Sequence, residues 1–143
     1  MGLDLSCNGL SAKCGSYARV QKIRRLLLEG IKFYIEMEYP SENDAIDYIC
    51  MLFGDKNQIV YENFCFEKNQ ILARINGLDG FLPFIHHSDN SGSLSSQEAK
   101  KFMQTWEITK EYMNDELKDF ERKFYLEFIF LESIQSREDI NFF

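Results

Sequence analysis

LPFIHHSDNSGSLSSQE, residues 82–98, is the stretch from which the fold of this chain can be interpreted. Its first residues, together with Phe81, form a short apolar run, which is typical of a buried strand. A polar loop around Gly92 follows this run. Ser95 and Glu98 then have the spacing of a capping box, in which each side chain accepts a hydrogen bond from the other residue's backbone N–H. The order predicts a strand, a polar loop and a capped helix.

The loop also fits the register of a calcium-binding loop, with Gly92 at its sixth position. Histidine at the first position is a poor ligand for a hard cation, and only two of the five side chains are carboxylates. A turn stabilised by Asp and Ser side chains, with Gly92 at positive φ, needs no ion. We favour this turn and expect no cofactor, with a divalent metal as the alternative. The metal ligands in that alternative would be His87, Asp89, Ser91, Ser95 and Glu98.

The composition predicts one globular domain over residues 1–143, because 45% of the residues are hydrophobic and 15% are aromatic. No apolar run approaches the roughly 20 residues that span a bilayer. The N-terminus has no basic segment ahead of an apolar core, so we expect no export signal and a cytoplasmic protein. The four cysteines lack a C-x-x-C spacing and are expected to be free thiols. A zinc site using Cys7, Cys14 and the histidines is the alternative.

The charge is unevenly distributed along the chain. The net charge is −7, yet residues 1–35 carry six lysines and arginines against two acids. General nucleic-acid binding is not expected from an acidic protein, because contacts to phosphate dominate that affinity. The basic N-terminal part could still bind a small anion.

The periodicity predicts an α+β fold with about four helices on one side of a small sheet. Residues 71–75 fit either a strand or a short helix. The closing residues 140–143 could lie against the sheet. The expected strands are 2–7, 59–66 and 81–86, with a loop after the first; the expected helices are 16–38, 41–54, 95–117 and 118–136.

Three patches resemble an uncharacterised family of small phage and bacterial proteins: GLDLS at 2–6, GSYARVQKIRR at 15–25 and HHSDNSGSLSSQE at 86–98. The chain differs from that family in having Ser91 and Ser93 where acidic residues are usual, which makes an obligatory metal less expected. The resemblance implies an arrangement of residues more than an activity. The residues it marks are Ser16, Tyr17, Lys22, Arg24, His87, Ser88, Asp89, Gly92, Ser95 and Glu98.

Our first functional hypothesis is a non-enzymatic protein that binds an anionic, nucleotide-like small molecule. The N-terminal turn of the first helix offers free N–H groups and the positive end of the helix dipole. The expected ligand-binding residues are Ser16, Tyr17, Lys22, Arg24, His86, His87, Ser88 and Asp89. If strands 2–7 and 81–86 paired in parallel, the two following helices would start at the same end of the sheet and bring these residues to one pocket.

Two other hypotheses come from different classes of function. A metal-assisted hydrolase would use His86 or His87 with Asp89 and Glu98. Adjacent histidines in an extended segment point to opposite faces, so only one of them would serve. An interaction protein would use the aromatic C-terminal helix, through Phe124 and Phe128, to contact a copy of itself or another protein.

Overall fold

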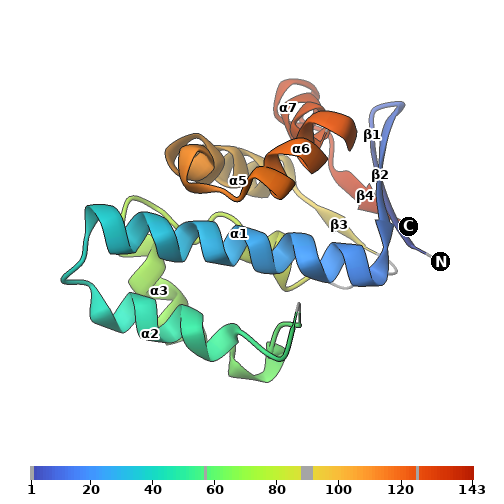
Figure 1. Ribbon diagram of the computed structural model, residues 1–143. Helices are drawn as coiled ribbons and strands as arrows, with labels where there is room; N and C mark the ends of the chain where they lie inside the picture. Colours follow the sequence, from blue (N-terminus) through green and yellow to red (C-terminus); the bar gives the residue numbers. More distant parts are fainter. Residues whose placement is uncertain (1, 57, 88–91, 125) are drawn as a thin grey trace.

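A computed structural model describes residues 2–56, 58–87, 92–124 and 126–143, without the side chains of residues 2 and 120–126. The α+β prediction is confirmed: helices gather on one side of an antiparallel sheet (Figure 1). The elements in chain order are β1 (Gly2–Cys7), β2 (Leu10–Ser16), α1 (Tyr17–Glu38), α2 (Asn43–Leu52), η1 (Tyr61–Asn63), α3 (Phe66–Arg74), α4 (Leu82–Ile85), β3 (Ser93–Leu94), α5 (Ser96–Thr109), η2 (Lys110–Tyr112), α6 (Asp115–Phe124), α7 (Leu126–Ser136) and β4 (Ile140–Phe142).

The sheet begins with a β-hairpin. The loop expected after residue 7 is in fact a second strand, β2, which pairs antiparallel with β1. Asn8 and Gly9 connect them at φ +49° and +86°, the left-handed pair that a tight hairpin turn requires. Leu3 and Leu5 of β1 are fully buried, so this strand presents its apolar face to the helices.

The other two sheet strands are the C-terminal segment and a short piece of the central stretch. The strand order is β2-β1-β4-β3, and all pairs are antiparallel. Leu5 lies opposite Phe142, and Leu94 lies opposite Ile140. Residues 140–142, which were expected only to lie against the sheet, are a strand within it. Parallel pairing of the first strand with residues 81–86 was wrong.

Neither of the other two predicted strands is in the sheet. Residues 82–85 form α4, with Pro83 in its first turn, where a missing backbone N–H costs little. Residues 61–63 form η1, and Ile59 makes only an isolated bridge to Phe53. Both segments are short apolar runs without clear alternation, and such runs do not distinguish a strand from a buried helix.

Two helices, α1 and α5, begin at the caps that the sequence predicted. Ser16 caps α1 by accepting the Arg19 N–H at 3.3 Å, and Ser95 and Glu98 form the complete capping box of α5. The helix predicted over 95–117 ends at Thr109, and the range predicted as a helix over 118–136 is described as α6 and α7 on either side of residue 125. The early end of the helix predicted over 95–117 has a tertiary cause. Met113 is extended, and its sulfur packs against Gly30 of α1.

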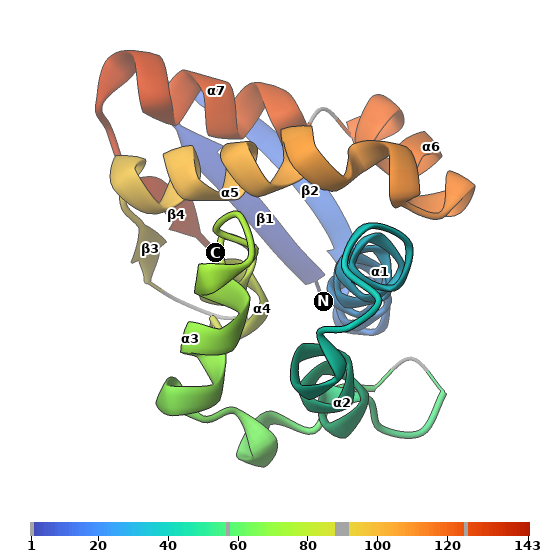
Figure 2. The same ribbon diagram turned by 90° about the vertical axis from the view of Figure 1, so that its left-hand side faces the viewer.

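The core lies between the sheet and the helices in front of it (Figure 2). Helices α5 and α7 pack along each other, and α1 packs on α2. Phe84 of α4, Phe102 of α5 and Phe130 of α7 are buried together; the rings of Phe102 and Phe130 stack at 4.0 Å. This cluster holds α4, and with it the histidines that follow α4, against the rest of the fold.

Candidate functional site

One face of α1 carries the residues from which the candidate site is built. Tyr17, Gln21 and Arg24 are four and then three residues apart, so they lie on one stripe of the helix. Gln21 Nε2 donates to the hydroxyl oxygen of Tyr61 at 2.8 Å, and Arg24 Nη1 donates to the same oxygen at 3.3 Å. Tyr61 is thereby tied to α1 across 37 residues of sequence.

Arg24 is the most unusual of these residues, because its side chain is only 1% exposed. Its Nη2 donates to the backbone carbonyl of His87 at 3.1 Å, and its guanidinium lies 5.3 Å from the centre of the Phe84 ring. A charged group is buried at a high cost unless it is hydrogen bonded. Arg24 therefore joins α1, the Tyr61 segment and the end of α4 through its bonds.

Three aromatic rings, those of Tyr61, Phe64 and His86, lie together beside this arginine. Tyr61 and Phe64 stack with ring centres 6.0 Å apart and an interplanar angle of 21°. The exposed ring of His86 lies 5.0 Å from Phe64 and 6.1 Å from Tyr61. We call Gln21, Arg24, Tyr61, Phe64 and His86 the Arg24 cluster; it combines a buried positive charge, polar groups and aromatic surface.

His87 points into a different environment from that of His86. Its ring stacks on Phe142 of β4 at 3.8 Å, and its Nε2 is 3.2 Å from the Ser93 carbonyl oxygen. Gly92, at φ +103°, lets the backbone pass this ring, since a Cβ there would come within 3.1 Å of it. The two histidines are therefore held by different elements and do not form a paired site.

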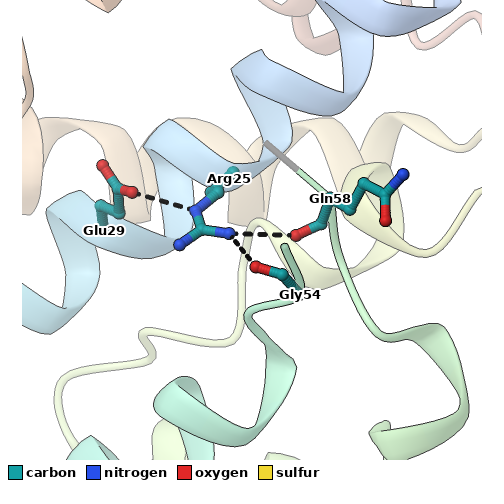
Figure 3. A network of polar contacts seen from close by, with 4 residues as sticks. All are labelled: Arg25, Glu29, Gly54 and Gln58. Atoms are coloured by element: carbon teal, nitrogen blue, oxygen red, sulfur yellow. Dashed lines mark hydrogen bonds and ion pairs between the residues drawn. The ribbon is translucent and has the colours of Figure 1, made fainter. Parts of the chain in front are cut away.

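A second arginine of α1, Arg25, positions the segment that leads to Tyr61 (Figure 3). Arg25 Nη1 donates to the carbonyl oxygens of Gly54 at 2.6 Å and Gln58 at 3.3 Å. Its Nε donates to Glu29 at 3.1 Å, which holds the guanidinium in place. The chain between α2 and η1 is thus fixed on α1 three residues before Tyr61 begins η1.

The structure places the other sequence-predicted residues differently. Lys22 points away from Arg24 and forms an ion pair with Glu116 of α6 at 2.5 Å, so it is not part of the Arg24 cluster. Ser16 is used as the cap of α1, and Tyr17 is half-buried on the same stripe as Arg24. Ser88 and Asp89 lie outside the described residues.

Sequence reasoning missed Gln21, Tyr61 and Phe64. Gln21 could have been found from the helical period that links Tyr17 to Arg24. The two aromatic residues were assigned to a strand of the sheet, which hid them as possible site residues. Only the packing of η1 against α1 brings them to Arg24.

The metal hypothesis has little structural support. Glu98 Oε1 accepts the Ser95 N–H at 2.9 Å in the capping box, so this carboxylate is already used. Asp89 and Ser91 lie outside the described residues. Within the part of the chain that is described, no three His, Cys, Asp or Glu side chains are grouped as metal ligands.

We expect calcium not to stabilise the protein. Ser95 and Glu98 already hydrogen bond to each other's backbone in the capping box of α5, so an ion that used these side chains would have to replace those bonds. Thermal melts in millimolar calcium chloride and in excess chelator should coincide within about a degree. A calcium-dependent rise of several degrees, absent with magnesium, would contradict this expectation.

The four cysteines are free thiols, as predicted. Burial raises the pKa of Cys14 to about 12, although the positive charge of Arg24 acts in the opposite direction. Burial also raises the pKa of Cys7, whose Sγ lies 3.6 Å from the Glu138 carbonyl oxygen. Cys7 pairs with Leu10 next to the hairpin turn, whereas Cys14 lies opposite Leu3 and Asp4 near the other end of the hairpin. The two cysteines are therefore not placed to bind one zinc ion, and the described residues contain no group of three metal-ligating side chains.

The C-terminal helix exposes part of its apolar surface. On α7, Phe128 is 59% exposed and Leu131 is 37% exposed. The side chain of Phe124 lies outside the described residues. The exposed apolar face is therefore described only at Phe128 and Leu131. The interaction hypothesis stays a prediction.

The chain was also compared with known proteins. No model of a known protein family, no curated protein and no solved structure matches it. The resemblance to small phage and bacterial proteins therefore stays a prediction. No helix in the described ranges is long and apolar enough to cross a bilayer.

Proposed function

We propose that the protein binds an anionic small molecule with an aromatic ring, such as a nucleotide, at the Arg24 cluster. The observation that carries this proposal is the convergence of three distant segments on one guanidinium, with aromatic rings beside it. Arg24 comes from α1, Tyr61 from η1, and His86 and His87 from the end of α4. Such convergence of polar groups next to apolar surface is typical of small-molecule sites.

Each part of the cluster suits one part of such a ligand. The exposed ring of His86 and the adjoining Phe64 offer a surface on which a planar base can stack. The Tyr61 hydroxyl oxygen accepts hydrogen bonds from Gln21 Nε2 and from Arg24. The hydroxyl hydrogen can be donated to Gln21 Oε1, at 3.1 Å, or to an oxygen of a ligand. Arg24 is too buried to be the main contact; its charge makes the site favourable for an anion.

We propose binding without chemical conversion. The two histidines, which are the residues best suited to proton transfer near neutral pH, are held apart by Phe64 and Tyr61 on one side and Phe142 on the other. A general acid and a general base acting on one ligand would have to converge on it. The alternative of a metal-assisted hydrolase would require ligands beyond those that the described residues bring together.

A thermal-shift screen followed by calorimetry tests the proposal. The probes are adenosine and guanosine monophosphates, the matching nucleosides and inorganic phosphate, each with and without magnesium. We expect a nucleotide to raise the melting temperature, because binding to the folded state stabilises it by mass action. The nucleoside and phosphate alone should bind more weakly, since each uses only half of the site.

Two variants connect the binding to the cluster. His86→Ala removes an exposed ring, and Tyr61→Phe removes one hydroxyl; each should weaken nucleotide binding about tenfold. Lys22→Gln is the matched control, because Lys22 lies on α1 but pairs with Glu116. The proposal fails if no nucleotide binds or if His86→Ala binds as the natural chain does. A nucleotide converted to product in the presence of magnesium would favour the hydrolase instead.

A further inference from the structure

A second surface feature lies on the side of α1 opposite Arg24. It is an open groove of about 410 Å³ between the middle of α1, the end of α2 and the η2 turn. Phe33 lies nine residues, or about two and a half helical turns, after Arg24 and so faces the opposite way. Its ring lines the groove together with Phe53 and Tyr112. Glu29 and Glu36 of α1 lie along it. We call this feature the Phe33 groove.

One end of the groove already binds a cation of the chain itself. The Arg25 guanidinium lies 4.6 Å from the centre of the Phe53 ring. Its Nε donates to Glu29, as Figure 3 shows. An aromatic face and a carboxylate together thus hold a guanidinium here. This combination is the usual host for organic cations in proteins.

The other end of the groove has the same chemistry with more of its surface open. Phe33 is 49% exposed, and its ring lies 5.7 Å from that of Tyr112. The Tyr112 hydroxyl donates to the Glu38 carboxylate, which raises the pKa of Tyr112 to about 12 and fixes the ring. Lys32 pairs with Glu36 at 2.9 Å, and a solvent-exposed pair at this spacing is weak enough to exchange for an incoming cation.

We propose that the Phe33 groove docks an amphipathic segment of a partner protein that carries lysine or arginine. Charge complementarity favours a basic partner: Glu29 and Glu36 line the groove with one lysine, Lys32, and Glu38 adds a third carboxylate where α1 continues beyond it. Apolar surface continues along α1 to Met37, which is 61% exposed. A surface that offers methionine and phenylalanine beside acids fits a helix with both apolar and basic side chains.

Fluorescence polarisation with a synthetic peptide tests this proposal. The probe is a labelled helical peptide with leucine on one face and lysine on the other; the comparison peptide has glutamate in place of lysine. We expect only the basic peptide to bind, and we expect Phe33→Ala and Glu36→Lys each to weaken it about tenfold. Both positions are exposed, so these variants should keep the fold.

Matched controls separate the groove from general attraction to an acidic protein. Phe66→Ala removes an exposed aromatic ring elsewhere, and Glu67→Lys makes the same change in net charge as Glu36→Lys. Both should bind the peptide like the natural chain, and so should His86→Ala, since this site is independent of the Arg24 cluster. Equal loss in the control variants, or unchanged binding in Phe33→Ala, would overturn the proposal. N-acetyl-lysine methylamide binding as tightly as the peptide would also overturn it, in favour of a small organic cation.

Discussion

Replacing Gly80 with alanine should lower the free energy of unfolding by about 3 kcal/mol, at the upper end of what overpacking costs. Gly80 is buried in the turn between α3 and α4, directly against α5. A Cβ at this position would lie 2.1 Å from Thr105 Oγ1 and 2.3 Å from the Lys101 carbonyl oxygen. The second contact is to helix backbone, which cannot rotate away as a side chain can, so the turn must move off α5.

Urea denaturation followed by circular dichroism measures this effect, and the melting temperature should fall by about 10 °C. Gly77→Ala is the matched control. Gly77 lies in the same turn, and a Cβ there would meet no atom within 4 Å, although its φ is +71°. This control should cost only about 1 kcal/mol, from backbone strain. Equal losses in the two variants would mean that the close contact with α5 is not the cause.

Replacing Arg24 with alanine should have an effect of similar size, about 3 kcal/mol. The change removes the hydrogen bonds to Tyr61 and to the His87 carbonyl, together with the contact to the Phe84 ring. It also leaves a cavity in a fully buried position. Arg24→Lys should recover only part of the loss, because an ammonium group cannot reach both partners with a planar fork.

The same denaturation experiment tests this prediction without a ligand. Arg74→Ala is the control, since Arg74 is an exposed arginine in the last turn of α3 and its loss should change stability by less than about 0.5 kcal/mol. The near-ultraviolet spectrum of Arg24→Lys should also change, because Tyr61 loses one of its two donors. If Arg24→Ala is as stable as Arg74→Ala, the guanidinium does not hold the three segments together.

Local sequence signals determined where α1 and α5 begin. Ser16 and the pair Ser95 and Glu98 satisfy backbone N–H groups within the same turn, so their effect is independent of the rest of the chain. The apolar periodicity of residues 17–38 likewise predicts both the helix and its buried face, and the left-handed preference of Asn8-Gly9 places the first turn.

Contacts between distant residues decided which segments enter the sheet and where the later helices end. The run at 81–85 is apolar on all sides, and it becomes a short helix because Phe84 packs with Phe102 and Phe130 instead of pairing with β1. The helix predicted to reach residue 117 ends early, because Met113 packs into the space above Gly30. Neither partner lies within one turn of the residues it affects, so a local pattern does not contain this information.

The candidate site shows the same division. The stripe of Tyr17, Gln21 and Arg24 follows from helical periodicity, so the sequence by itself determined that these side chains share a face. Tertiary structure alone decided what that face meets: Tyr61 arrives on the η1 segment held by Arg25, and His87 arrives at the end of α4. Hydrogen bonds across 37 and 63 residues of sequence depend on how the intervening elements pack, and burial of their apolar surface sets that packing.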